Sequence, residues 1–172
     1  MAMTLIQRKQ LKNAVERVLH VQGNYTGGIL EMAVVIDASL SKETASERGI
    51  ELAELLKSTS EVFRNVRLNT ILWQGDETFI KQVTSLAVLQ MGRFFEDYES
   101  MDITKTWDGL LALLKKFYAR SKLIFVLSDA DFAVLDREAA KESLQPFLHK
   151  KLILQSESDI HSGTELFMSL LQ

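Results

Sequence analysis

The chain has 172 residues, 47% of them hydrophobic and 25% charged, and a formal net charge of −3, which together indicate one globular domain and exclude a disordered chain. It carries no basic tract for nucleic acid or an anionic membrane, and no apolar run near the ~20 residues that span a bilayer. The absence of cysteine excludes disulfides and thiol chemistry, and with no signal-peptide pattern at its start we expect a cytoplasmic protein.

The first predicted elements are an amphipathic helix and a buried strand. Thr4 and Gln7 have the form of a capping box, and apolar residues then recur at helical spacing, which predicts a helix over 4–21. A turn cluster at 23–28 ends this helix. The segment Ile29–Asp37 is a nearly continuous apolar run rich in β-branched residues, which is typical of a central strand buried on both faces of a parallel sheet.

The middle of the chain predicts a second helix, two strands and a weaker helix. After a polar loop, small and apolar residues fall on one helical face, at Ala45, Gly49, Leu52 and Leu56. Val66–Trp73 is predicted to be a strand, and Thr78–Val83 a weaker strand that lies antiparallel at the edge of the sheet. Leu86–Tyr98 is predicted to be helical, although its apolar residues are poorly patterned.

The last third of the chain begins with a stronger helix near Thr106. Leu123–Leu127 is a strongly apolar strand that runs directly into Ser128 and Asp129. A helix, a short strand and a terminal helix are predicted to follow, over Asp136–Lys150, Leu152–Gln155 and Thr164–Leu171. Pro146 is expected to bend the first of these helices.

This alternation of strands and helices predicts an α/β fold. We expect a Rossmann-like, doubly wound and mostly parallel sheet with helices on both faces and one antiparallel edge strand. The sequence contains no internal repeat, low-complexity segment or long linker, so residues 1–172 are predicted to form a single domain.

Oxygen-bearing side chains follow the two most apolar strands. Asp37 ends the first strand and is followed by Ser39 and Ser41, while Asp129 closely follows Leu127. Thr104 precedes a helix that must pack beside the same edge. In open α/β sheets, ligands bind outside the carboxyl ends of the strands, near the point where strand order reverses. Convergent hard oxygen ligands there predict a site for Mg²⁺, or for Mn²⁺ or Ca²⁺.

These segments resemble the metal-ion-dependent adhesion site of von Willebrand factor A domains. Asp37-Ala38-Ser39-Leu40-Ser41 is similar to the family's Asp-x-Ser-x-Ser loop, which also follows a hydrophobic first strand. Thr104–Leu110 looks like the second loop, with a threonine of a Thr-x-Thr pair that opens a helix. IFVLSDAD is similar to the strand that ends in Thr-Asp-Gly, which makes Asp129 the acid of the third loop. The resemblance covers residues 29–172, and the helix before residue 22 lies outside it.

The resemblance implies a role for each of these side chains. Ser39 and Ser41 would bind the ion directly, and Thr104 would bind it directly or through water. Asp37 and Asp129 would supply negative charge, largely through waters and hydrogen bonds to the serines. An ion that is incompletely coordinated by the protein would then accept an acidic side chain from a partner protein.

The chain departs from the family's pattern where the family has glycine. Leu40 stands between the two serines, Asp102-Ile103 replaces two glycines before the threonine, and Ala130 replaces the glycine after the acid. Ser128 replaces the common threonine. The oxygen-bearing side chains are therefore kept while the permissive glycines are absent, and we expect Leu40 to be exposed as a partner contact.

Simpler interpretations of the same residues remain open. Asp37 and its serines also suit the capping of the next helix, and Thr106 is predicted to be a cap, not a ligand. Asp131 is expected to be solvated or bonded to the loop backbone. Trp73 and Trp107 are expected to be packing residues, and Trp107 is the better surface candidate of the two because it lies beside the site. The three histidines are scattered, which argues against a zinc or catalytic role for any of them, at His20, His149 and His161.

Two functions from different classes fit the sequence. The leading hypothesis is a non-enzymatic protein-interaction module that binds a partner protein through a metal ion. A metal-free variant of it would bind through contacts such as Leu40 and Trp107. The alternative is a Mg²⁺-dependent phosphatase of the haloacid dehalogenase-like class, which also places an aspartate at the end of its first strand. That chemistry usually needs a second aspartate two positions later, where this chain has Ser39, and no lysine-bearing motif stands out between the strand ends.

Overall fold

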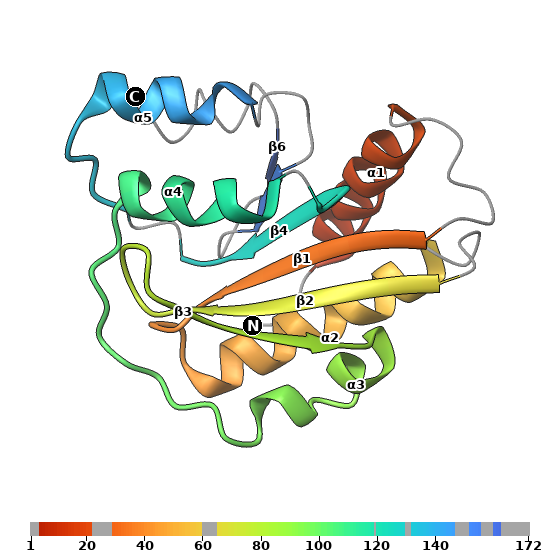
Figure 1. Cartoon of the computed structure of the whole chain (residues 1–172). Helices are drawn as coiled ribbons and strands as arrows, with labels where there is room; N and C mark the ends of the chain where they lie inside the picture. Colours follow the sequence, from red (N-terminus) through yellow and green to blue (C-terminus); the bar gives the residue numbers. More distant parts are fainter. Residues whose placement is uncertain are drawn as a thin grey trace.

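The framework of the fold is a six-stranded sheet with the order β3-β2-β1-β4-β5-β6 (Figure 1). The computed structural model describes residues 4–21, 29–59, 65–118, 120–129, 132–146, 152–155 and 160–162. The strands are β1 (Ile29–Asp37), β2 (Asn65–Trp73), β3 (Phe79–Thr84), β4 (Leu123–Leu127), β5 (Leu152–Gln155) and β6 (Ile160–Ser162). Each of the five predicted strands is present, and its predicted bounds agree to within one residue.

The centre of the sheet is parallel and both of its edges are antiparallel. β1 pairs in parallel with β2 and with β4, and β4 pairs in parallel with β5. β3 lies antiparallel to β2 at one edge, which confirms the predicted edge strand. At the other edge the short β6 lies antiparallel to β5, and the sequence did not predict it. A strand of three residues is too short to show an alternating pattern.

The helices predicted over 4–21, from near Thr106 and from Asp136 each begin within one residue of the predicted start. Six helical segments lie within the described residues. They are α1 (Leu5–Val21), α2 (Lys42–Thr59), α3 (Leu86–Gln90), the 3₁₀ turn η1 (Arg93–Phe95), α4 (Trp107–Tyr118) and α5 (Arg137–Leu144). The predicted helix over 86–98 is broken in two, because Gly92 takes a left-handed conformation with φ 77° between α3 and η1. The helix predicted over 136–150 ends at Leu144, two residues before Pro146. The predicted turn at 23–28, residues 147–150 and the terminal helix over 164–171 lie outside the described residues.

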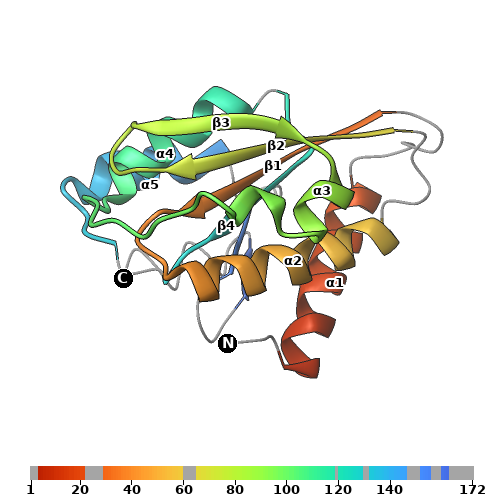
Figure 2. The same ribbon diagram turned by 90° about the horizontal axis from the view of Figure 1, so that it is seen from below.

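Helices cover both faces of the sheet (Figures 1 and 2), and a hydrophobic core lies on each face. Along β1, Met32 and Val34 alternate with Ala33 and Val35, so that successive side chains enter different cores. The first core includes residues of α1, α2, α3 and η1, and the second includes residues of α4 and α5. This explains why β1 is apolar along nearly its whole length, and it confirms the predicted helices on both faces.

The start of α1 shows the predicted capping box. The Thr4 hydroxyl accepts from the Gln7 backbone N–H at 3.1 Å, and the Gln7 side chain accepts from the Thr4 N–H at 3.0 Å. Each side chain therefore satisfies a backbone donor that the first helical turn leaves without a partner. None of the described helices is long and apolar enough to cross a bilayer.

The strand order reverses between β1 and β4. The chain passes from β1 to β2 and β3 on one side, and then returns through α4 to β4 on the other side of β1. The register pairs Ile36 with Leu127, so that Asp37 and Ser128 come next to each other at the carboxyl ends of the two strands. The predicted site therefore lies where open α/β sheets bind their ligands.

Candidate functional site

Asp37 is completely buried at the end of β1, and neighbouring groups bond both of its carboxylate oxygens. Oδ1 accepts from the backbone N–H of Ser39 at 2.8 Å and from its hydroxyl at 2.7 Å. Oδ2 accepts from the hydroxyl of Ser128 at 2.6 Å. A buried carboxylate needs such donors, because burial removes the water that would otherwise solvate its charge. Asp37 thus joins the loop after β1 to the loop after β4.

Lys105 brings an ammonium group into the middle of these oxygens. Its Nζ lies 2.7 Å from Asp129 Oδ1, donates to Ser39 Oγ at 3.0 Å, and lies 3.5 Å from Asp37 Oδ2. Its side chain is only 13% exposed, whereas that of Asp129 is 42% exposed at the rim. Asp37, Ser39, Lys105, Ser128 and Asp129 are called here the strand-end cluster.

The surroundings of Lys105 favour its charged form. Burial alone would lower the pKa of the ammonium, but the hydrogen bond to Asp129 and the negative charges of Asp37 and Asp129 outweigh burial and raise that pKa above its ordinary value. Lys105 therefore carries a positive charge across the physiological pH range.

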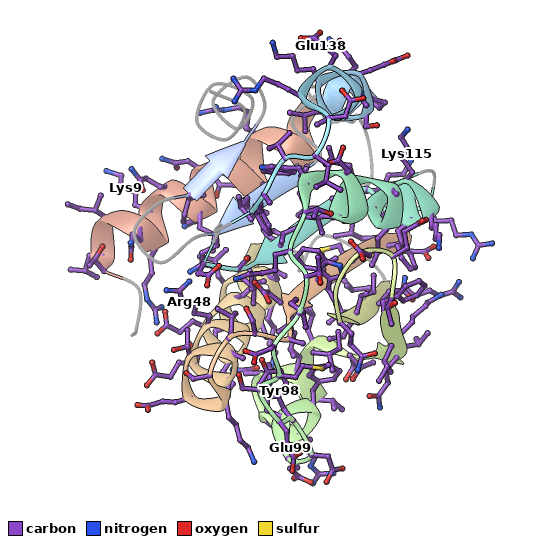
Figure 3. The ribbon with its side chains drawn as sticks, turned by 90° about the vertical axis from the view of Figure 1, so that its left-hand side faces the viewer. Lys9, Arg48, Tyr98, Glu99, Lys115 and Glu138 are labelled. Carbon is purple, nitrogen blue, oxygen red and sulfur yellow. The ribbon has the colours of Figure 1, made fainter. Side chains whose placement is uncertain are left out.

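The segment that begins at Tyr98 and Glu99 crosses the carboxyl edge of the sheet (Figure 3), and Lys105 further along it reaches the strand-end cluster. The Tyr98 hydroxyl lies 2.6 Å from the carbonyl oxygen of Leu40 and 3.2 Å from that of Asp37, within donor distance of both. The Met101 N–H donates to the carbonyl of Ala38 at 3.0 Å. Burial, together with the charge of Asp37, raises the pKa of Tyr98 to about 12. The phenol therefore stays a neutral donor that holds this segment against the loop after β1.

Ser41 takes no part in the strand-end cluster. Its hydroxyl accepts from the Thr44 N–H at 3.1 Å and donates to the Thr44 hydroxyl at 2.9 Å, which makes it the cap of α2. The capping role that the sequence left open therefore falls to the second serine of the motif. A hollow of about 160 Å³ lies between Ser41 and Asp129. It is lined by Ser39, Leu40, Ser41, Thr44, Arg48 and Asp129.

The two threonines of the second loop also differ from the predicted ligand pattern. Thr104 is exposed, and the contact described for it is made by its backbone carbonyl, which accepts from the Asp76 N–H at 3.2 Å. Thr106 caps α4 by accepting from the Gly109 N–H at 3.0 Å, as predicted. The residue between them supplies the side chain that enters the strand-end cluster.

Leu40 was predicted to be exposed as a partner contact, and that prediction is wrong, whereas Trp107 is a packing residue as expected and not a surface residue. Leu40 is 6% exposed because its side chain belongs to the core beneath α2. Trp107 is 2% exposed and packs against Phe132, with ring centroids 4.9 Å apart. Asp131 and His149 lie outside the described residues, as do the side chains of His20 and His161.

The arrangement does not fit the predicted Mg²⁺ site. Ser41 uses its hydroxyl for the helix cap, and the Lys105 ammonium occupies the space among the oxygens of Asp37, Ser39 and Asp129. A divalent ion would need the same oxygens at about 2.0–2.1 Å, which a cationic ammonium at this distance does not permit.

The sequence predicted three members of the strand-end cluster as site residues, Asp37, Ser39 and Asp129, named Ser128 only as the replacement of a threonine, and gave no role to Lys105. The position of Lys105 was visible in the sequence, because it stands between the two threonines that were assigned to the second loop. A surface lysine is the ordinary interpretation of such a residue, and no local pattern shows that its side chain turns inward. The sequence matches no protein-family model and no curated protein.

Proposed function

We propose that the chain is a non-enzymatic protein-interaction module of the von Willebrand factor A type, which binds a partner protein through the loops at the carboxyl edge of its sheet. The observation that supports this most is the strand-end cluster, in which side chains from three loops meet at the point where strand order reverses.

The state of Asp37 favours binding over catalysis. A nucleophilic carboxylate must reach its substrate, but Asp37 is completely buried and both of its oxygens accept hydrogen bonds from neighbouring loops. Such a residue fixes the relative positions of the loops. Rigid loops lose little conformational entropy on binding, which favours specific recognition of a protein surface.

The resemblance also implies that a divalent ion mediates contact with an acidic side chain of the partner. This part of the hypothesis stays a prediction, and it requires the Lys105 ammonium to leave the cluster. The metal-free variant of the hypothesis requires no such movement. In the metal-free variant, exposed polar groups at the carboxyl edge of the sheet, such as Ser41 and Asp102, contact the partner protein, since Leu40 and Trp107 are buried.

The phosphatase alternative gains one feature from the structure. Lys105 pairs with the aspartate at the end of the first strand, so a lysine does stand between the two strand ends. It still lacks a general acid, because the position two residues after Asp37 is Ser39, whose hydroxyl cannot supply a proton of comparable acidity. Mg²⁺-dependent turnover of a generic phosphate ester that disappears in Asp37→Asn would support this alternative and contradict our proposal.

A matched pair of charge reversals tests the interaction surface. Asp102→Lys changes an exposed acid on the segment that crosses the edge, and Glu54→Lys makes the same change on the later part of α2, away from it. Proteins captured by the wild type are identified, purified and titrated against each variant by calorimetry. We expect Asp102→Lys to weaken binding by about tenfold and Glu54→Lys by less than about twofold. Equal affinity of both variants would contradict an interface at this edge.

A further inference from the structure

We propose that the Lys105 ammonium is the resident cation of the strand-end cluster and takes the place of a divalent metal ion there, so that the loops at the carboxyl edge hold their arrangement without metal. The inference concerns how the loops are held, and it does not depend on which partner they bind. It rests on the contacts of one side chain with three others, two from the loop after β1 and one from the loop after β4.

The contacts of Lys105 are those expected of a cation surrounded by oxygen ligands. Nζ contacts a carboxylate oxygen of Asp129, the hydroxyl oxygen of Ser39 and, at 3.5 Å, a carboxylate oxygen of Asp37. An ammonium group has three N–H donors, which is enough for one donor toward each of these oxygens. The Ser39 hydroxyl accepts from Lys105 and donates to Asp37, so it relays the interaction between them.

Charge balance supports the same conclusion. The buried carboxylate of Asp37 and the half-exposed carboxylate of Asp129 carry two negative charges, and a cation between them is needed to offset their repulsion. Lys105 supplies that charge from within the chain, where a metal site would take it from solution. The rim position of Asp129 lets water solvate the negative charge that one ammonium leaves unbalanced.

The backbone around Lys105 holds its side chain in this position. The Lys105 carbonyl accepts from the Ala133 N–H at 2.9 Å, and the Ala133 carbonyl accepts from the Trp107 N–H at 2.9 Å. Thr106 pairs with Ala133 in an isolated parallel bridge and caps α4. The backbone that carries Lys105 is thus already fixed, so burial of its side chain costs only the rotamer freedom of the side chain itself, which the three contacts of Nζ offset.

Thermal unfolding with and without metal tests the proposal. The wild type, Lys105→Ala and the control Lys116→Ala, which loses an exposed lysine paired with Glu77, are compared in EDTA and in millimolar MgCl₂ or MnCl₂. We expect the wild type and the control to unfold at the same temperature with and without metal. We expect Lys105→Ala to unfold at a lower temperature in EDTA and to regain about 3 °C or more with metal, since its oxygens are then free for an ion.

Two results of this experiment would overturn the proposal. The first is a metal-dependent stabilisation of the wild type, because it would mean that an ion displaces the ammonium. The second is a Lys105→Ala protein that unfolds like the Lys116→Ala control in EDTA and responds to no ion. The wild-type measurement needs no variant, so it decides the first point even if Lys105→Ala does not fold.

A double-mutant comparison then tests whether the charge of Lys105 acts on Asp37. We expect Lys105→Met to lower the unfolding temperature in the wild-type background and to lower it by less than half as much in an Asp37→Asn background. An equal loss in both backgrounds would overturn the proposal, since the lysine would then act without its charge partner. Neither experiment uses the partner protein, so a failure here is distinct from a failure of the binding hypothesis.

Discussion

The two serines of the Asp37–Ser41 loop lie two residues apart and have different structural roles. Ser39 turns toward the sheet, where its hydroxyl donates to Asp37 and accepts from Lys105. Ser41 turns toward the helix and caps α2 through Thr44. The comparison shows that a motif of oxygen-bearing residues does not by itself define one ligand set, because an adjacent helix competes for the same hydroxyls. The predictions below test this division of roles.

The largest effect is expected at Asp37. Asp37→Ala removes the acceptor for the Ser39 N–H, the Ser39 hydroxyl and the Ser128 hydroxyl, and it leaves the Lys105 ammonium without one of its counter-charges. Removing one member of a buried, charged network costs about 3–5 kcal/mol, because the remaining polar groups lose their partners. Urea unfolding followed by circular dichroism measures this loss.

Asp37→Asn is the matched control for that variant. It keeps the size of the side chain and one carbonyl oxygen, so we expect a loss well below that of Asp37→Ala. If both substitutions cost under about 1 kcal/mol, the hydrogen bonds of Asp37 do not hold the loops in place, and the role given to the strand-end cluster is wrong.

Tyr98→Phe is expected to have the next largest effect. It removes the only hydroxyl that joins the segment after η1 to the carbonyls of Leu40 and Asp37 in the described structure. Because these carbonyls lie in a buried region, the loss is expected to be about 1–2 kcal/mol near neutral pH. Equilibrium unfolding of the two proteins in urea measures it, and a difference of less than a few tenths of a kcal/mol would contradict the contact's importance.

The stability of Tyr98→Phe is also expected to depend on pH differently from that of the wild type. The pKa of Tyr98 is raised to about 12 in the folded state, whereas an unfolded tyrosine ionises near pH ~10. Above that pH the unfolded state releases a proton that the folded state keeps, so stability is complete below about pH 10 and falls as the pH rises toward 12. Tyr98→Phe should lose less stability over this range. It should still lose some, because the raised pKa of Lys105 acts in the same direction.

Ser41→Ala tests the other half of the loop and is expected to cost about 1 kcal/mol, the usual loss for a helix cap. Ser41→Asp should restore stability, because aspartate caps helices equally well. Ser46→Ala is the control within the same helix, since the Ser46 hydroxyl donates to the carbonyl of Glu43 at 3.2 Å and caps no helix end. If Ser41→Asp fails to restore what Ser41→Ala loses, Ser41 is not simply a cap.

Much of the fold was predictable because it depends on local patterns. A continuous apolar run gave β1 and β4 their exact bounds, and the capping box gave the start of α1. The predicted helix over 86–98 was wrong in its second half, because Gly92 turns the chain there. A left-handed glycine is a single-residue event, and a periodicity averaged over a window does not reveal it.

The site was predictable only in part, because it depends on contacts between distant residues. Asp37 and Asp129 were found because each follows an apolar strand, and parallel strands end at the same edge. The inward turn of Lys105 depends on the hydrogen bonds of the Lys105 and Trp107 backbone with Ala133, far along the chain. The burial of Leu40 depends on a core that α2 completes. Neither fact has a local signature in the sequence.

The smallest effect is expected at Asp129, and its dependence on salt distinguishes the two acids of the strand-end cluster. Asp129 bonds Lys105 at 2.7 Å but is 42% exposed, so Asp129→Asn should cost less than about 1 kcal/mol. Because solvent ions screen an exposed pair, the stability lost in Asp129→Asn should shrink in molar salt. The stability lost in Asp37→Ala should persist, since Asp37 is completely buried. Unfolding in low and high salt measures both. If the two losses respond equally to salt, the strand-end cluster is not divided into a buried and a solvated half, and Lys105 holds both acids in the same way.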